Sequence, residues 1–247
     1  MNIAVIFAGG AGTRMYSKDK PKQFLELYHK PIIIHTLEHF DDNPEIDAIV
    51  ISCLSDWISY LEQLIQEHHL QKVRKIVPGG ETGQLSIYHG LCAAREVAGE
   101  DADDSIVLIH DGVRPMITQK LITDNIHSVR ENGSSITTGP VTETLLEVDE
   151  ESKGILRVPS RRDSRVAKAP QSFRLRDILA AHERAMSEGR DDFIDSCTMM
   201  HHYGYSLTLI EGPAQNIKIT TQEDYYLMRA MLEAEENEQL SSVSERV

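Results

Sequence analysis

The sequence has few cysteines, and the three it has stand far apart. They are Cys53, Cys92 and Cys197 in a chain of 247 residues. An odd number without a Cys-x-x-Cys pair predicts neither a structural zinc site nor a disulfide framework. Three reduced core thiols are the simpler interpretation, and they favour the cytoplasm as the location of the protein.

Basic charge is also scarce. The chain carries 25 lysines and arginines against 39 aspartates and glutamates, a formal net charge of −14. Duplex DNA, other nucleic acids and anionic membranes are therefore excluded as main partners, because phosphate-rich surfaces need a broad basic footprint. A small anionic substrate stays possible, since a local basic site can lie on an acidic surface.

Long apolar stretches are absent as well. No run approaches the roughly 20 residues that span a bilayer, and the N-terminal apolar stretch has no basic flank typical of a signal peptide. A hydrophobic content of 40% with 26% charged residues is ordinary for a folded domain. The length predicts one domain over residues 1–234, with 235–247 as a flexible acidic and serine-rich tail.

Short apolar runs alternate with amphipathic segments along most of the chain. We predict strands at 3–7, 46–52, 74–77, 105–109, 206–210 and 217–219. The predicted helices are 31–40, 57–69, 84–98, 118–131, 175–187 and 221–234. Such alternation is typical of an α/β fold with a mainly parallel, doubly wound, Rossmann-like sheet.

One stretch, residues 142–168, breaks this alternation. Its first half is acidic and its second half is basic. We expect an extended β-arm there, because so polar a segment has little to pack against within one domain. The two halves could pair across a two-fold axis, so the arm also predicts a homodimer.

A glycine loop directly follows the first predicted strand. Its glycines are Gly9, Gly10 and Gly12. Glycines at the carboxyl end of a central strand let backbone N–H groups approach a phosphate chain. The loop lacks the Gly-Lys-Ser/Thr of a Walker A motif, and Met15 replaces the third glycine of the dinucleotide fingerprint. A plain tight turn is the alternative.

Basic residues follow this loop closely. They are Arg14, Lys18, Lys20 and Lys22. A solvated basic loop would explain them, but a triphosphate clamp explains their density better in so acidic a protein.

Five ordered motifs resemble the cytidylyltransferases that act on polyol phosphates. The first joins residues 8–15, AGGAGTRM, with 20–24, KPKQF. The others are GGET at 79–82 with Ser86, HDGVRP at 110–115, PQSF at 170–173 and NIKIT at 216–220. The resemblance covers nearly the whole chain and implies a nucleotidyltransferase fold.

The resemblance implies a reaction in which a polyol phosphate attacks the α-phosphorus of CTP. It assigns catalysis to Arg14, Lys22 and Lys218. It places CTP against the backbone of Ala8, Gly9, Gly10, Gly12, Gly80 and Glu81 and the hydroxyl of Ser86. For this chemistry, charge neutralisation by arginine, lysine and Mg²⁺ matters more than a covalent nucleophile.

The acceptor half of the site is implied in the same way. Asp111 would bind the polyol or the Mg²⁺ ion, Thr144 would lie near the polyol, and Arg161 would reach the substrate phosphate of the partner subunit. Asp111 and Arg161 have purely structural alternatives: a loop-capping carboxylate for Asp111, and a solvated hairpin arginine for Arg161.

Three positions depart from the family pattern. Gly83 stands where arginine is usual, and Ala169 and Ile194 stand where threonines are usual. The nucleotide half thus matches the family, while the wall around the acceptor is more apolar. Other segments favour the ribitol 5-phosphate branch. The 2-C-methyl-D-erythritol 4-phosphate branch and an inactive nucleotide-binding protein stay as alternatives.

Overall fold

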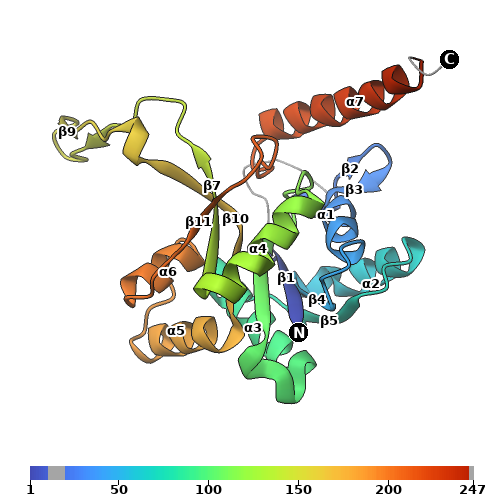
Figure 1. Cartoon of the computed structure of the whole chain (residues 1–247), viewed down its shortest axis with the longest axis horizontal. Helices are drawn as coiled ribbons and strands as arrows, with labels where there is room; N and C mark the ends of the chain where they lie inside the picture. The colour runs from blue at the N-terminus through green and yellow to red at the C-terminus, as the bar shows by residue number, and fades with distance from the viewer. Residues whose placement is uncertain (11–19, 245–247) are drawn as a thin grey trace.

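A twisted seven-stranded sheet forms the centre of the molecule (Figure 1). The computed structural model describes residues 1–10 and 20–244, with the backbone alone described for 235–244. The strand order is β11-β7-β10-β6-β1-β4-β5. The strands are β1 (Asn2–Ala8), β4 (Ala48–Cys53), β5 (Val73–Pro78), β6 (Ile106–Asp111), β7 (Ser134–Pro140), β10 (Arg165–Arg174) and β11 (Leu209–Glu211). Within this sheet β10 runs antiparallel to both of its neighbours, and the other pairings are parallel. The expected mainly parallel α/β fold is confirmed.

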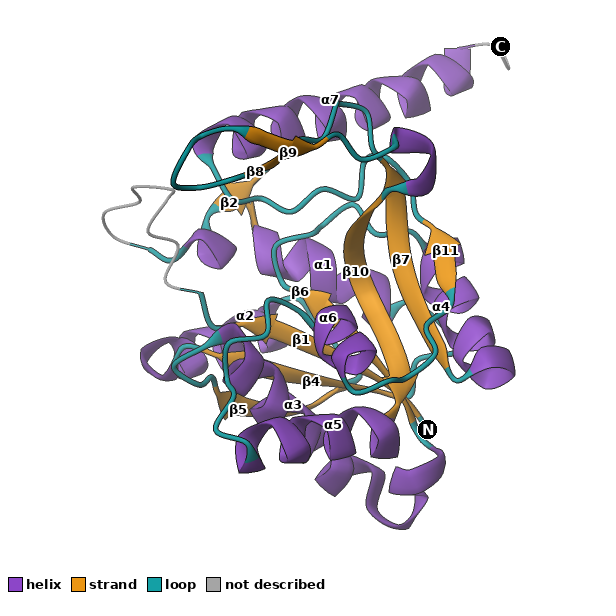
Figure 2. Cartoon of the chain, turned by 90° about the vertical axis from the view of Figure 1, so that its left-hand side faces the viewer, coloured by secondary structure: helices purple, strands orange, loops and turns teal. Residues whose placement is uncertain are grey.

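Helices cover both faces of the sheet. One face carries α1 (Ile32–Asp41), α2 (Ile58–Glu67) and α4 (Gln119–Asn132). The other carries α3 (Gly83–Ala98), α5 (Leu175–Ser187) and α6 (Ser196–His202), and Figure 2 shows α3 and α5 together beneath the strands. Alternate residues of β1 enter opposite cores: Ile3 packs toward α3 and Ala4 toward α1. A strand buried on both sides must be apolar throughout, which is why β1 shows no polar alternation.

Helix boundaries follow local capping chemistry. The Thr82 hydroxyl accepts a hydrogen bond from the Leu85 N–H at the start of α3, and Thr118 does the same for Leu121 in α4. Thr118 was predicted as a cap from its place before an amphipathic run. Gly133 ends α4 in the left-handed conformation, at φ 83°, which glycine adopts without steric cost.

The predictions were wrong for parts of the second half of the chain. The short strand expected at 217–219 is an extended segment outside any ladder. Neither β7 nor most of β10 was predicted, because Ser134–Pro140 is rich in serine, threonine and glycine rather than large apolar residues. The helix α6 was also missed.

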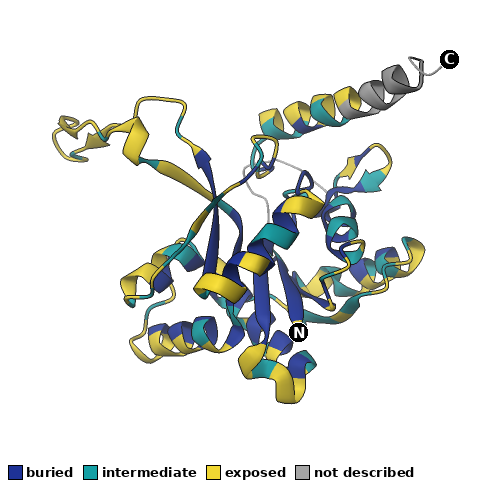
Figure 3. Ribbon diagram, in the orientation of Figure 1, coloured by how far each residue is buried: buried dark blue, intermediate teal, exposed yellow. Residues whose placement is uncertain are grey.

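The arm is present. It leaves the sheet between β7 and β10 and carries a small antiparallel hairpin of β8 (Glu147–Val148) and β9 (Ile155–Arg157). Figure 3 shows it exposed along almost its whole length. The acidic and basic halves meet within the arm, because Glu147 pairs with Arg157 across the hairpin. Charge pairing across a dimer axis is therefore not needed to explain their segregation.

A third apolar cluster anchors the C-terminal helix α7 (Gln222–Ser244). Met228 of α7 packs with Ile219 and Leu27, the last of these in the small hairpin of β2 (Glu26–Leu27) and β3 (Lys30–Pro31). The helix was predicted to end at 234, but it continues to Ser244, through residues with ordinary helix propensity. Whether 235–247 is flexible stays a prediction, and 245–247 lie outside the described residues. No described helix is long and apolar enough to cross a membrane.

Candidate active site

The carboxyl ends of four parallel strands meet at one edge of the sheet. Phe7 in β1 pairs with Asp111 in β6, and Ala8 pairs with Cys53 in β4. Cys53 in turn pairs with Pro78 at the end of β5. This register brings the glycine loop after β1, the Gly79-Gly80 loop after β5 and the Asp111 loop after β6 to one place, as expected for ligand binding in open α/β sheets.

Ser86 holds the two glycine loops together. Its hydroxyl accepts a hydrogen bond from the Gly80 N–H at 3.1 Å and lies 2.9 Å from the Thr82 carbonyl oxygen. A Cβ on Gly9 would stand only 2.9 Å from this hydroxyl oxygen, so Gly9 must be glycine for the loops to approach this closely. The predicted residues Gly9, Gly80 and Ser86 are thus brought together, and Glu81 continues the same loop.

Lys22 lies on a short 3₁₀ helix, Lys22–Phe24, next to the end of β1. Its ammonium donates a hydrogen bond to the Ile219 carbonyl oxygen at 3.0 Å. The neighbouring Gln23 is buried and donates to the Ala8 carbonyl oxygen at 2.7 Å, which ties this turn to the sheet. That carbonyl keeps a second lone pair for a ligand.

Asp111 is buried at the end of β6 between two cations. One carboxylate oxygen lies 2.6 Å from the Lys218 ammonium, and the other accepts a hydrogen bond from the Arg114 guanidinium at 2.7 Å. Burial would raise the pKa of Asp111, but the charges of Arg114 and Lys218 outweigh burial and hold that pKa well below its usual range. Asp111 is therefore an anion that orients two cations at the edge of the sheet.

Lys218 reaches Asp111 from the segment that leads into α7. Ile219 is fully buried in the third cluster and Ile217 packs against it, so the side chain between them points the other way. The alternation predicted from the sequence is confirmed, although one backbone bond, from the Ile219 N–H to the Val113 carbonyl, replaces the expected strand. Lys218 keeps 40% of its side-chain surface exposed, so it can meet a ligand.

A cavity of about 270 Å³ opens beside this cluster. Its charged end contains Asp111, Arg114, Lys168 and Lys218. Burial and the nearby Arg114 charge lower the pKa of Lys168. From this end the cavity continues between α3, α5 and α6, where its lining includes Ile87, His182, Phe193, Ser196 and Met199.

The three departures from the family pattern all line this cavity. They are Gly83 at the start of α3, Ala169 in β10 and Ile194 before α6. A Cβ on Gly83 would meet nothing within 4 Å, so the missing side chain leaves open space rather than relieving a clash. Ala169 and Ile194, which the sequence predicts in the acceptor wall, thus line the same cavity as Gly83.

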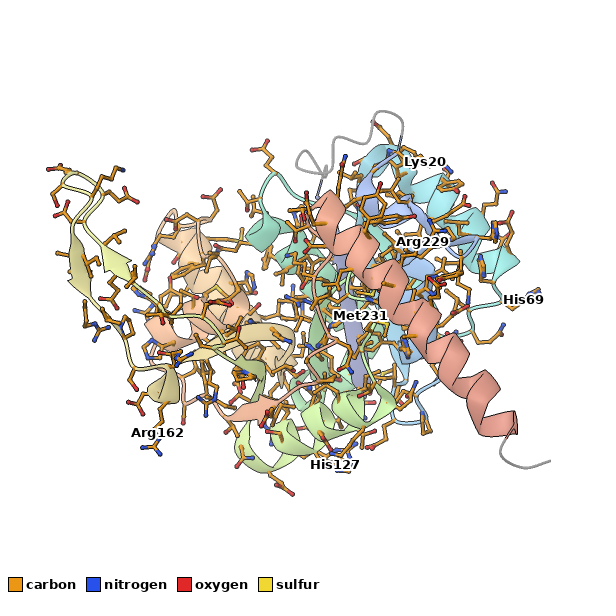
Figure 4. All side chains as sticks on the ribbon, turned by 90° about the horizontal axis from the view of Figure 1, so that it is seen from above. Lys20, His69, His127, Arg162, Arg229 and Met231 are labelled. Atoms are coloured by element: carbon orange, nitrogen blue, oxygen red, sulfur yellow. The ribbon has the colours of Figure 1, made fainter. Side chains whose placement is uncertain are left out.

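The arm residues lie apart from this cluster. Thr144 is exposed, and Arg161 donates from its guanidinium to the Thr142 carbonyl oxygen within the arm. Figure 4 shows the neighbouring Arg162 on the opposite side of the molecule from Lys20, which follows the glycine loop. Neither Thr144 nor Arg161 lines the cavity of its own subunit. Gly12 and Arg14 lie outside the described residues, and Gly10 is exposed, with no described atom within 4 Å of a Cβ built on it.

Two cationic residues of the site were missed by sequence reasoning. Arg114 lies three residues after Asp111 in the motif HDGVRP, and this spacing at a strand end was a usable signal. Lys168 was assigned to the arm, but a register shift in β10 between Ala167 and Gln171 brings it into the cavity. Pro170 lies within that shift and cannot donate a ladder hydrogen bond, so it was a usable signal.

The residues offer a metal ion little direct ligation. Among residues 1–10 and 20–244, no group of three or more histidine, cysteine or carboxylate side chains could hold one. Asp111 is a single carboxylate whose two oxygens both face cations. This donor set fits an ion held mainly by substrate phosphates and water, with one protein carboxylate, which is a common arrangement for Mg²⁺.

Two glycine loops meet at the carboxyl edge of a doubly wound sheet, and beside them buried Asp111 orients Arg114 and Lys218. This arrangement defines a nucleotidyltransferase-like site. The chain matches the model of the IspD family, 2-C-methyl-D-erythritol 4-phosphate cytidylyltransferase, over residues 2–234. It belongs to this family of cytidylyltransferases.

Named relatives agree with this assignment. A ribitol-5-phosphate cytidylyltransferase of Streptococcus agalactiae is 52% identical over 240 residues, covering 97% of this chain and 98% of the relative. A 2-C-methyl-D-erythritol 4-phosphate cytidylyltransferase of Clostridium botulinum is 36% identical over 94% of this chain and 97% of that protein. The crystal structure of 4-diphosphocytidyl-2C-methyl-D-erythritol synthase from Anaerococcus prevotii matches with a TM-score of 0.80 and 26% identity, over 94% of this chain and 96% of that one.

Proposed function

We propose that this protein transfers a cytidylyl group from CTP to D-ribitol 5-phosphate, giving CDP-ribitol and pyrophosphate. The observation that carries the choice of acceptor is the identity of 52% to a ribitol-5-phosphate cytidylyltransferase, against 36% to a relative named for the erythritol substrate. Ala169 and Ile194 support a changed acceptor, since they line the cavity and replace hydroxyls that the family pattern places there.

In the proposed reaction, a phosphate oxygen of ribitol 5-phosphate attacks the α-phosphorus of CTP. A new P–O bond forms, the bond from that phosphorus to the bridging oxygen breaks, and pyrophosphate leaves with the electron pair. Lys22 and Lys218 neutralise the charge that builds up on the α-phosphoryl oxygens. Their spacing is set by protein contacts, because Lys22 binds the Ile219 carbonyl directly after Lys218.

The CTP half of the proposed site uses the loops that Ser86 joins. The backbone of Ala8, Gly9, Gly10, Gly80 and Glu81 would bind the nucleotide, and Gly12 and Arg14 would bind the triphosphate. Gly9 and Gly79 lie close together, since a Cβ on Gly79 would stand 3.5 Å from the Gly9 Cα. A narrow site lined by these glycines would favour a pyrimidine over a purine by size. Ser86 would then act through the loop backbone as well as by its own hydroxyl.

A divalent cation, Mg²⁺ or a similar ion, would neutralise the triphosphate when bound with CTP. Asp111 is the residue that fits it as a protein ligand. The acceptor phosphate, with the polyol hydroxyls nearest to it, would take the charged end of the cavity, near Arg114, Lys168 and Lys218.

A homodimer would complete the site. Seven large apolar side chains of the arm region are at least 39% exposed: Leu145, Leu146, Val148, Ile155, Leu156, Val158 and Val166. Such a surface is unusual on a monomer and supports an interface between two copies. Arg161 and Thr144 would then act at the partner's acceptor site. Location in the cytoplasm agrees with three free cysteines and stays a prediction.

A panel assay tests the proposal. Pyrophosphate release is measured with CTP, ATP or GTP, each combined with ribitol 5-phosphate, 2-C-methyl-D-erythritol 4-phosphate or glycerol 3-phosphate, with Mg²⁺ and with EDTA. We expect turnover that needs CTP, Mg²⁺ and ribitol 5-phosphate. A preference for the erythritol substrate would move the protein to the other branch of the family. Nucleotide binding without any turnover would make it an inactive binding protein.

A further inference from the structure

Two buried polar side chains in the cavity have no hydrogen-bond partner among residues 1–10 and 20–244. His182 in α5 is 1% exposed, and neither of its ring nitrogens has a partner in this part of the chain. Ser196, the first residue of α6, is 3% exposed, and its hydroxyl oxygen is likewise unpartnered. Both line the cavity beside Asp111 and Lys218.

The other polar side chains around them are satisfied. Gln84 donates to the Arg190 carbonyl and accepts from the Phe193 N–H. Gln171 donates to the Asp195 carboxylate and accepts from the Cys197 N–H. These bonds fix the turn before α6, so the cavity wall is built around His182 and Ser196 without giving either of them a partner.

Leaving the His182 imidazole and the Ser196 hydroxyl buried without partners lowers the stability of the fold. A buried polar group without a partner costs about 1–3 kcal/mol, and native proteins keep few of them. The neighbouring side chains here are apolar, namely Ile87, Phe193 and Met199. Tyr88 stacks on the His182 ring, with ring centroids 5.7 Å apart.

The polarity of the cavity matches a phosphorylated polyol. Its cationic end, at Arg114, Lys168 and Lys218, suits the phosphate. Away from that end the lining is apolar apart from Gln84, Gln171 and Asp195, which have partners, and the imidazole and hydroxyl, which have none among the described residues. A neutral imidazole offers one donor and one acceptor, and a serine hydroxyl offers both, which is what an alcohol needs. Burial lowers the pKa of His182 to about 4, so the ring is neutral at neutral pH.

We propose that His182 and Ser196 form a subsite that binds the terminal C1 hydroxyl of the acceptor, the end farthest from the phosphate. This inference rests on the proposed function. It makes the two residues specificity determinants: they select acceptors whose carbon chain is long enough to reach them and ends in an alcohol.

The test compares variants that remove only the polar atoms. His182→Phe keeps a ring for stacking on Tyr88, and Ser196→Ala loses one oxygen. We expect each to raise KM for ribitol 5-phosphate by about 5- to 20-fold with KM for CTP unchanged, the usual loss for one hydrogen bond. Their Tm should stay level or rise, because an unsatisfied buried polar group has been removed. His182→Gln should partly restore the acceptor KM.

A matched control is available. Ser135 is also fully buried with an unpartnered hydroxyl, but it lies outside the cavity. Ser135→Ala should leave both KM values unchanged. If Ser196→Ala and His182→Phe behave like this control, the cavity holds water there and the proposal is wrong. A fall in Tm with unchanged acceptor KM would show a purely structural role and would also overturn it.

An analogue identifies the hydroxyl group. Wild-type protein should use 1-deoxy-D-ribitol 5-phosphate with a KM about 5- to 20-fold above that of ribitol 5-phosphate, and His182→Phe should abolish this difference. An equal difference in wild type and variant would exclude the C1 contact. If wild type prefers another polyol phosphate, the proposed function fails, but the same variants measured with that acceptor still decide the subsite. If it uses none, calorimetry with ribitol 5-phosphate replaces kinetics.

Discussion

The Lys218 ammonium lies 2.6 Å from a carboxylate oxygen of Asp111, across 107 residues of sequence. Asp111 is held at the end of β6 by the sheet, while Lys218 arrives on an extended segment fixed by its apolar neighbours. The ion pair fixes the position of the Lys218 ammonium, while 40% of the lysine side-chain surface stays exposed. A partly exposed, oriented cation is what a developing phosphoryl charge requires.

We expect Lys218→Gln to lower kcat by about 100-fold or more, because a charge used mainly in the transition state acts on turnover. KM for CTP should change little. Steady-state kinetics check this, with Lys120→Gln as a control that removes an exposed lysine paired with Asp124. A variant with normal kcat and only a raised acceptor KM would assign Lys218 to ground-state binding.

Gly9→Ala should weaken CTP binding by about 10-fold or more and lower the Tm, because the new Cβ would lie 2.9 Å from the Ser86 hydroxyl and push the Gly80 loop away. Gly10→Ala is the matched comparison, since a Cβ there meets nothing within 4 Å, and its Tm should not change. Calorimetric titration with CTP and thermal melts give both readouts. Equal Tm losses in the two variants would contradict the steric argument.

Subunit mixing tests the arm. An Arg161→Ala subunit and a Lys22→Ala subunit should each be nearly inactive alone. If Arg161 serves the partner's acceptor site, random exchange should restore about a quarter of the sites, since half of the dimers are mixed and each has one intact site. Leu156→Glu should prevent recovery by breaking the interface, because Leu156 is 68% exposed in the single subunit. An active monomer in light scattering, or exchange without recovery, would rule this arrangement out.

Stability should fall as the pH drops below neutrality. Burial lowers the pKa of His110 to about 3 and that of His182 to about 4, from 6.5. The unfolded chain therefore binds more protons than the folded one between about pH 6.5 and 4, so stability is full above 6.5 and is lost through that window. Within this window each histidine contributes about 1.4 kcal/mol per pH unit to the slope of the free energy of unfolding against pH.

Urea denaturation at pH 7.5, 6 and 5 measures this slope. His182→Phe should make the slope of unfolding free energy against pH shallower by the contribution of one histidine. His201→Phe, which changes an exposed histidine, should leave the slope unchanged. Identical slopes in wild type and His182→Phe would mean that His182 titrates alike in both states.

The sequence by itself determined the parts that depend on local pattern. Runs of β-branched residues predicted β1, β4 and β6, and Thr118 predicted the start of α4, because burial and capping act over a few residues. The glycine loop, Lys22 and the motif around Asp111 marked the nucleotide side for the same reason: backbone approach to phosphate needs particular residues at fixed spacing.

Tertiary structure decided what depends on pairing between distant segments. β7 and β10 have weak strand patterns and are strands because they pair with each other and with their outer neighbours, β11 beside β7 and β6 beside β10. The shift in β10 brings Lys168 into the cavity, and the meeting of α5 with α6 turns His182 and Ser196 into unpaired groups on one wall. The sequence around a single histidine or serine does not indicate whether its side chain will have a hydrogen-bond partner. That partner comes from a distant segment, which only the fold brings close.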